Sequence, residues 1–350
     1  MNETIQWNDW EAFCCVIEQG TFTAAAAALD CPKSRVSAAV ARLETAIGAK
    51  LLERTTRRMR LTDAGGAVYR DVAPLFAAVQ NGYFRELGLE VDTTPSAGGA
   101  AGIPGLVGGS FDVAYGNVVS ALLAAQQGLD VTVIAAGTNV TDPKLDATGI
   151  IVRSESGIKS GKDLEGKSIA VNTRNNVIWL YARAWVKATG GDPDHVTFKE
   201  VPFPQMEDAL RQQRVDAAFM VPPFAMVATQ KGGLSKIGSP YSDVQPGVDV
   251  GQYVTTRKQL AAKPETLKKF VAGLRKGIEW YNANLANDAL LNLISGYTKA
   301  DIALLKLAPM PIAPLRTDVT QVRKTMELMI ENKLLAGSLD LDKIIDPLAL

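Results

Sequence analysis

The character of the amino-acid sequence changes near residue 75, and the part beyond that point constrains the fold most. There, apolar runs alternate with stretches of helical periodicity. The runs Asp130–Ala136 and Lys167–Val171 are predicted to be buried strands, whereas Val177–Ala188 and Pro264–Asn282 are predicted to be amphipathic helices. Strands and helices that alternate in this way predict an α/β domain with a largely parallel sheet. A chain of 350 residues has room for this domain and for another before it.

The residues before this change show short helical patterns and a charged segment. Asn8 can cap a first helix that ends at Gly20, and a second, alanine-rich helix is predicted for Phe22–Leu29. A third helix is predicted for Lys33–Ile47, and the segment Leu51–Leu61 is predicted to form a short basic hairpin. The fold class predicted for this part is therefore an all-α winged helix-turn-helix.

Basic residues are concentrated in this module, although the whole chain has a net charge of zero. Between Pro32 and Arg60, only Glu44 and Glu53 oppose eight basic residues, which are Lys33, Arg35, Arg42, Lys50, Arg54, Arg57, Arg58 and Arg60. A local cationic surface of this kind favours contact with the phosphates of double-stranded DNA. The third helix would enter the major groove, while the hairpin touches the backbone or the minor groove. A helical bundle with a solvated basic loop is the alternative interpretation.

The module resembles the DNA-binding domain of LysR-type transcriptional regulators over residues 7–70. The matching segments are Thr21–Leu29, Val36–Ser37, Arg42–Glu44, Gly48, Leu51–Leu52, Arg54–Arg58, Leu61–Thr62 and Ala64–Gly65. This resemblance implies that the third helix faces bases and phosphates and that the hairpin is the wing. The DNA-binding residues that we predict are Lys33, Ser34, Arg35, Ser37, Arg42, Arg54, Arg57 and Arg58. Two positions depart from the family pattern: Pro32 replaces the usual polar cap, and Ala38 stands where many relatives carry a base-reading arginine.

A fourth helix is predicted to join the two parts, from a cap at Thr62 to Gly82. Pro74 falls inside this pattern and should kink the helix or split it near Asp71, because proline lacks a backbone donor. In LysR-type proteins the equivalent linker helix pairs two subunits, so the resemblance implies a homodimer or homotetramer. The predicted boundaries are residues 1–62 for the DNA-binding domain and 63–82 for the linker helix, which merges into the first helix of the next domain.

From Ala73 onwards the chain resembles the substrate-binding proteins of ABC importers, in the group for nitrate, sulfonate, taurine and thiamine precursors. The segments that carry this resemblance are Ala73–Val91, Ser96–Asn117, Asp163–Lys167 and Ala209–Ala218. It implies a two-lobed type II periplasmic-binding-protein fold, with residues 83–150 and 250–350 in lobe 1 and 151–249 in lobe 2. Relatives begin this domain with a strand that lines the pocket. Here the DNA-binding module occupies that place, so the first lobe is expected to lack a central strand or to borrow one.

Ligands of open α/β sheets bind at the carboxyl ends of strands, against helix N-termini that favour anions. Two such places are Ser96–Gly99, after a predicted strand Leu89–Thr93, and Asn172–Asn176, after Ser168–Val171. The predicted ligand-binding residues, which also include residues after the strands Asp112–Tyr115 and Ala217–Val221, are Ser96, Gly98, Tyr115, Asn117, Arg174, Asn175, Asn176 and Pro223. The alternatives are a plain turn for the glycine-rich loop and a solvated surface arginine for Arg174.

Residues for catalysis or metal binding are scarce. The chain has one histidine, His195, and no cysteine after Cys31, so we expect no enzyme activity, no metal site and no cofactor. A thiamine-precursor enzyme among the relatives needs a histidine and clustered cysteines, which are missing here. Cys14 and Cys15 are expected to fill a helical core. The start of the chain resembles no secretory signal, and no run of about eighteen apolar residues occurs, so we expect a cytoplasmic protein that does not associate with membranes.

Together these features predict a ligand-responsive, DNA-binding transcription regulator that senses a small anionic metabolite as its effector. The alternative is a substrate-binding protein of an ABC importer with a non-functional N-terminal head. The absence of a visible export signal argues against this alternative, because such proteins work outside the cytoplasm.

Overall fold

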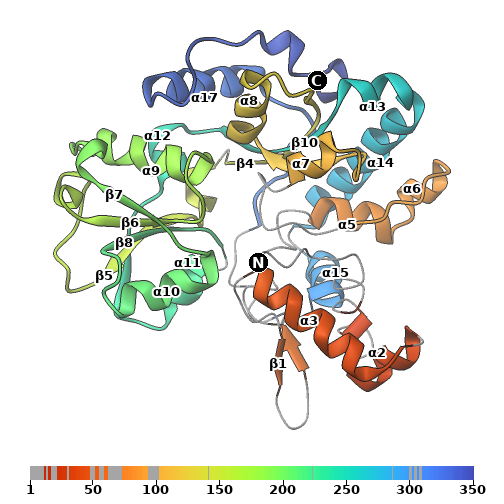
Figure 1. Ribbon diagram of the computed structural model, residues 1–350, viewed down its shortest axis with the longest axis horizontal. Coiled ribbons are helices and arrows are strands. Elements are labelled where there is room, and N and C mark those ends of the chain that lie inside the picture. Colours follow the sequence, from red (N-terminus) through yellow and green to blue (C-terminus); the bar gives the residue numbers. More distant parts are fainter. Residues whose placement is uncertain are drawn as a thin grey trace.

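Two separate β-sheets organise the chain beyond Ala73, and a small helical module precedes them (Figure 1). The computed structural model describes residues 12, 15–16, 22–29, 31–47, 52–54, 59–61, 73–93, 102–140, 142–222, 224–285, 287–298, 302, 306 and 310–350. Of residues 24, 43–47, 52–54, 59–61 and 296–298 it describes the backbone only.

The N-terminal module contains the predicted helix pair and hairpin. Helix α2 spans Phe22–Ala28 and helix α3 spans Lys33–Ile47, as the sequence predicted to within one residue. Small side chains let the two helices pack closely, and the buried residues between them include Ala25, Ala26, Val36, Ala39 and Val40. Strands β1 (Leu52–Arg54) and β2 (Met59–Leu61) pair antiparallel as the predicted wing. Of the predicted first helix, only residues 12, 15 and 16 are described, and they are helical and buried.

The first sheet beyond this module has three strands among the described residues, in the order β3-β10-β4. These strands are β3 (Ala114–Asn117), β4 (Thr132–Val140) and β10 (Val248–Thr255). Strand β10 runs antiparallel to both neighbours. The helices around this sheet are α5 (Ala73–Gln80), α6 (Tyr83–Glu86), α7 (Gly102–Val107), α8 (Val118–Gln126), α13 (Arg257–Ala262), α14 (Pro264–Ala283) and α15 (Asp288–Thr298). We call this body the first lobe.

The second lobe is built on a five-stranded sheet in the order β7-β6-β8-β5-β9. The strands are β5 (Gly149–Arg153), β6 (Ser168–Val171), β7 (Thr197–Glu200), β8 (Ala217–Met220) and β9 (Leu234–Gly238). Successive side chains of a strand point to opposite faces, so each face has its own core. Ile150 and Ile169 pack with the helices of one face, whereas Ile151 and Ala170 pack with those of the other. The helices of these faces (Figure 1) are α9 (Val177–Ala188) with α12 (Pro240–Val244), and α10 (Phe203–Arg211) with α11 (Phe224–Gln230).

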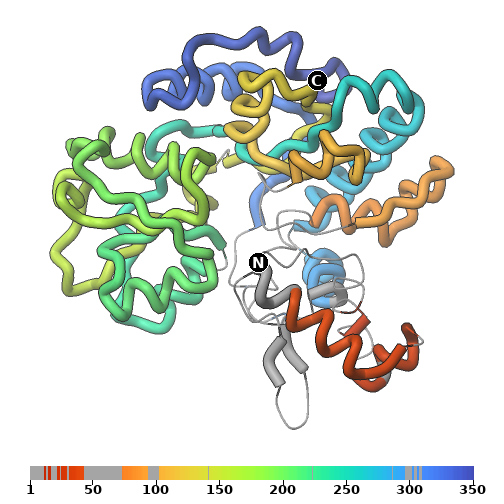
Figure 2. Tube along the Cα trace, viewed as in Figure 1, coloured from red at the N-terminus to blue at the C-terminus, as the bar shows by residue number. Residues whose placement is uncertain are grey.

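The prediction of a largely parallel sheet is wrong. Strand β6 is parallel to β7 and β8, but β5 is antiparallel to β8 and β9, and the first sheet is antiparallel throughout. The reason is the path of the chain, which Figure 2 traces: it leaves the first sheet after β4 and returns to it through β10. A strand that brings the chain back lies beside the outgoing strand in the opposite direction.

The predicted strand Leu89–Thr93 is also wrong, since these residues are described and form no strand. Leu89 and Val91 are half-buried against the apolar core that α5 and α14 form. The alternation of apolar and polar residues is therefore real, but it reflects packing against helices rather than pairing in a sheet. Among the described residues, both outer strands of the first sheet, β3 and β4, have a strand partner on one side only.

Helix α5 connects the N-terminal module to the first lobe and packs along α14. Pro74 is the second residue of α5 as described; residues 62–72 of the predicted linker helix, including the predicted break near Asp71, lie outside the described residues. A Cβ atom on Gly277 of α14 would lie 2.4 Å from the carbonyl oxygen of Pro74. Only glycine allows this approach, so α5 and α14 pack closely together. The buried face of α5 is therefore part of the core of the first lobe.

Helix α17 (Val319–Glu331) lies across both lobes. It contacts α8 of the first lobe, α9 of the second lobe and the crossing strand β10. The chain then returns to the first sheet, where Ile345 makes a parallel bridge to Val133 of β4. Among the described residues, the lobes are joined by the two crossing segments, by α17 and by the direct contact of α8 with α9.

Candidate functional site

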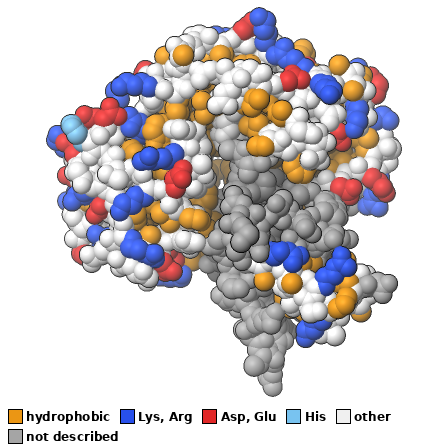
Figure 3. All heavy atoms as spheres, viewed as in Figure 1, with side chains coloured by type: hydrophobic (Ala, Val, Ile, Leu, Met, Phe, Trp, Pro, Cys, Tyr) orange, Lys and Arg blue, Asp and Glu red, His pale blue; other side chains and the backbone are white. Residues whose placement is uncertain are grey.

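The exposed face of α3 is the candidate DNA-binding surface. Lys33, Ser34 and Arg35 in its first turn are exposed, whereas Ser37 and Arg42 are half-buried. Val36 and Val40 on the opposite face are buried. Figure 3 shows Lys and Arg side chains on the part of the surface that carries this module. The geometry leaves the cations of the first turn directed at solvent, as a recognition helix requires.

The wing residues of the prediction are only partly placed. Arg54 is the last residue of β1 and pairs with Met59 across the hairpin, which puts its backbone in the wing. Arg57 and Arg58, between the two strands, lie outside the described residues, as do Ser96, Gly98 and Pro223 of the predicted ligand site.

Two asparagines at strand ends organise the candidate ligand site. Asn117 ends β3 and caps α8, with its Oδ1 accepting a hydrogen bond of 2.9 Å from Ser120 N. Asn176 caps α9 in the same way through Trp179 N at 3.1 Å, and its Nδ2 donates to Asn172 Oδ1 at 2.9 Å. Each lobe thus presents one buried asparagine at the N-terminus of a helix, where the helix dipole favours an anion.

Tyr115 contacts both crossing strands in the first lobe. Its hydroxyl is 2.9 Å from Thr138 Oγ1 on β4, and its ring meets Tyr253 of β10 edge to face at 5.1 Å between centroids. Gly137 and Gly251 have no side chains that would collide with this ring. The position of Tyr115 is therefore fixed by both crossing strands, a contact that no local sequence pattern could indicate.

Arg174 is held by the edge strand of the second sheet. Its Nη2 donates to the carbonyl oxygen of Phe198 at 2.9 Å, and its backbone N donates to Glu200 Oε1 at 2.6 Å. The next residue, Asn175, is exposed and has a φ of 56°, a left-handed conformation that asparagine tolerates better than most residues. The loop between β6 and α9 is thus tied to β7, with Asn176 buried and Asn175 facing solvent.

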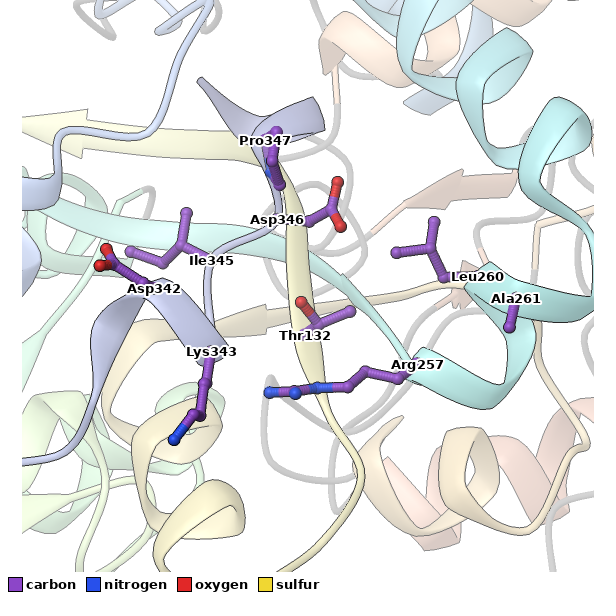
Figure 4. Close-up of a pocket in the computed structure, with 9 residues that line it drawn as sticks. All are labelled: Thr132, Arg257, Leu260, Ala261, Asp342, Lys343, Ile345, Asp346 and Pro347. Atoms are coloured by element: carbon purple, nitrogen blue, oxygen red, sulfur yellow. The ribbon is translucent and has the colours of Figure 1, made fainter.

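A surface pocket of about 390 Å³ lies elsewhere, at the outer end of the first lobe (Figure 4). It is lined by residues of β4, α13 and the C-terminal segment, namely Thr132, Arg257, Leu260, Ala261, Asp342, Lys343, Ile345, Asp346 and Pro347. Thr132 begins β4, whereas the crossing to the second lobe follows the other end of that strand. The pocket is therefore separate from the strand ends that carry Asn117 and Asn176, and nothing in the sequence pointed to it.

The described residues contain no group of three or more His, Cys, Asp or Glu side chains that could hold a metal ion. No helix in the described ranges combines the length and the apolar character needed to cross a bilayer.

A methyl group at Gly251 should disturb the contact between Tyr115 and the crossing strands. In Gly251→Ala, the new Cβ would lie 2.1 Å from Tyr115 Oη and 2.5 Å from Thr138 Oγ1. We expect the variant to lose about 1–3 kcal/mol of unfolding free energy, as overpacked sites do. Chemical denaturation followed by circular dichroism measures this loss. Gly337→Ala is the control, because nothing lies within 4 Å of its Cβ position; equal stability of both variants would contradict the prediction.

These features define a class of protein: two α/β lobes joined by crossing strands, with capped helix N-termini at the strand ends, form the fold of the periplasmic binding proteins. A solved relative is the alkanesulfonate-binding protein SsuA of Xanthomonas axonopodis pv. citri bound to MOPS, with a TM-score of 0.66 and 18% identity over 79% of this chain and 95% of that one. The nitrate-binding protein NrtA of Synechocystis PCC 6803 has a TM-score of 0.64 and 14% identity over 79% of this chain and 83% of that one. The chain belongs to the NMT1/THI5-like family, whose model matches residues 70–285.

The N-terminal module matches a second family. Residues 7–66 match the model of the bacterial regulatory helix-turn-helix proteins of the lysR family. An HTH-type transcriptional regulator of Xanthomonas campestris pv. campestris is 56% identical over 64 residues, which are 18% of each chain. The chain thus shares with this curated regulator less than a fifth of that protein's length. Both resemblances that the sequence predicted are confirmed.

Proposed function

We propose that this protein is a transcription regulator that binds double-stranded DNA through α3 and the wing and senses a small anionic effector between its lobes. The observation that carries this proposal is the union, in one chain, of a lysR-family helix-turn-helix with an exposed cationic first turn and a two-lobed binding body. The histidine and clustered cysteines of the thiamine-precursor enzyme among the relatives are missing from this chain, and we propose that the protein catalyses no reaction.

DNA recognition follows from the geometry of the module. In this proposal, α3 lies in the major groove, with Lys33, Ser34 and Arg35 at the groove and the hairpin at the phosphate backbone. A homodimer or homotetramer would present two such helices about 34–36 Å apart, one turn of DNA. Such a protein would act in the cytoplasm, where its DNA is.

Effector recognition rests on the two helix N-termini at the strand ends. Asn117 and Asn176 satisfy one backbone donor each, and the remaining first-turn donors of α8 and α9 favour an oxyanion. Relatives of the same fold bind alkanesulfonates or nitrate, which are also anions. An effector that binds better to one arrangement of the lobes than to another would shift the population, and α5 would pass the change to the DNA-binding module.

The test uses the full chain, with two measurements. Fluorescence anisotropy with a labelled duplex should show DNA binding that weakens steeply with salt, because counterions are released on binding. Thermal unfolding in the presence of sulfonates, nitrate, aromatic carboxylates and pyrimidines should identify an effector by a raised melting temperature. A chain that binds an anion but shows no salt-dependent DNA binding would instead be a substrate-binding protein with a non-functional head.

A further inference from the structure

A cluster of buried polar groups lies where the chain crosses between the lobes. Asn139 of β4 and Asp249 of β10 are direct partners across the two strands, which places their side chains side by side. Asp249 is 2% exposed, and its carboxylate accepts a hydrogen bond of 3.2 Å from Asp318 N. Asp318 in turn caps α17, the helix that contacts both lobes. Asp249 therefore links β10 to α17, which contacts both lobes.

Two oxygens of this cluster have no donor. Asp249 Oδ1 and Asn139 Oδ1 are both buried and without a hydrogen-bond partner among the described residues. Both are acceptors, and a buried acceptor left unpaired is costly. Gln252 Nε2 is a buried donor near Asp249 that also has no partner among the described residues. A proton on Asp249 would supply the donor that Asn139 Oδ1 lacks, since the carboxylic acid could then donate to its neighbour across the strands.

The surroundings of Asp249 favour that proton. Burial raises the pKa of Asp249 to about 7, and the nearby charge of Asp318 adds to the rise. The hydrogen bond from Asp318 N and the nearby Gln252 carboxamide oppose the rise in pKa without cancelling it. On the side of α9, the facing titratable group is Tyr181, whose pKa burial raises further from neutrality. The interactions that act on Asp249 thus include no cation.

We propose that Asp249 is a proton-operated latch at the junction of the lobes. With a proton on Oδ1, it donates to Asn139 Oδ1 and holds β10 against β4. When the proton leaves for solvent, that hydrogen bond is lost, and the new charge lies beside the Asp318 cap of α17. Acidification of the surroundings therefore stiffens the connection between the lobes, and alkaline conditions loosen it.

The sign of the pH dependence follows from the raised pKa. In the unfolded chain an aspartate has a pKa of about 3.9. The proton on Asp249 is therefore bound in both the folded and the unfolded chain only below about that pH. Between about pH 4 and pH 7 the folded chain keeps a proton that the unfolded chain has lost, so stability falls as pH rises and levels off above the folded pKa. Between pH 5 and pH 8 the equilibrium constant for folding should fall by about 100-fold from this group alone.

The test compares the full chain with Asp249→Asn over pH 5–9. Asparagine carries a permanent donor in place of the proton, so the hydrogen bond to Asn139 should persist at every pH. The equilibrium constant for folding of the variant should therefore no longer fall by about 100-fold between pH 5 and pH 8. Asp216→Asn is the matched control: burial raises the pKa of Asp216, but hydrogen bonds from Ser168 outweigh this and lower it below its usual range. With its pKa lowered, Asp216 is ionised in the folded chain over pH 5–9, as an aspartate is in the unfolded chain, so its variant should keep the wild-type slope in that range.

A second measurement does not depend on the stability of any variant. Hydrogen exchange of the backbone amides of β4 and β10 in the wild-type chain should become faster, relative to the second sheet, as pH passes 7, after correction for intrinsic exchange. Parallel pH profiles for the wild type and Asp249→Asn would overturn the proposal. An exchange pattern of the crossing strands that is constant across pH 7 would also overturn it.

Discussion

Replacing Lys33 and Arg35 together by alanine is expected to weaken the binding of duplex DNA by about 100-fold at low salt. Both side chains are exposed in the first turn of α3, and none of the contacts described above occupies their charged groups. Two hydrogen bonds from charged donors to DNA, at about 1.5 kcal/mol each, give this magnitude. The slope of log affinity against log salt should also fall by about two units, because two fewer phosphates are neutralised. Anisotropy titrations at several salt concentrations measure both quantities.

The control for this variant is Arg323→Ala with Lys324→Ala. These residues are also exposed cations on one helix, α17, so the pair removes the same net charge from a distant surface. It should leave the DNA affinity within a factor of about three, because only long-range attraction is lost. If both double variants bound DNA equally, the assignment of α3 as the recognition helix would be wrong. Loss of folding is checked by the melting temperature of each variant.

The largest effect on stability is expected from Trp185→Ala in the second lobe. Trp185 of α9 is 1% exposed, its Nε1 donates to Asp243 Oδ2 of α12 at 2.8 Å, and Gly238 leaves room for its indole. The variant removes this side chain, which leaves a cavity and takes away one of the two donors to Asp243 Oδ2, the other being Ser239 N. A loss of about 3–5 kcal/mol of unfolding free energy is expected. Denaturation followed by far-ultraviolet circular dichroism measures it, because tryptophan fluorescence changes with the substitution itself.

Trp280→Ala provides the comparison. Trp280 of α14 is only half-buried, at the edge of the core of the first lobe, so its removal should cost clearly less than that of Trp185. Equal losses for both variants would mean that the α9–α12 contact is not a principal stabilising contact of the second lobe.

Much of this protein could be predicted from local patterns. The bounds of α3 and α9 agree with the predicted ranges, because helical periodicity and capping residues act within a few positions of one another. The hairpin of the wing and the cationic first turn of α3, with Lys33 and Arg35, were also predicted from the sequence. The two family resemblances could also be found from the sequence, because they rest on residue types at fixed spacings along the chain. For the candidate ligand site, the sequence indicated that Asn117 and Asn176 stand where strands meet helices.

The tertiary structure decided what depends on residues far apart in the chain. Apolar periodicity does not specify the partner or direction of a strand. It could therefore predict neither the antiparallel placement of β10 nor that Leu89–Thr93 forms no strand. The hydrogen bond between Tyr115 and Thr138 joins positions 23 residues apart. The pairing of Asn139 with Asp249 brings together residues separated by the whole second lobe. Burial of a carboxyl group in this crossing depends on how both lobes pack around it. The sequence by itself therefore determined the local elements and the charge of the DNA-binding face, whereas the junction of the lobes exists only in the folded chain.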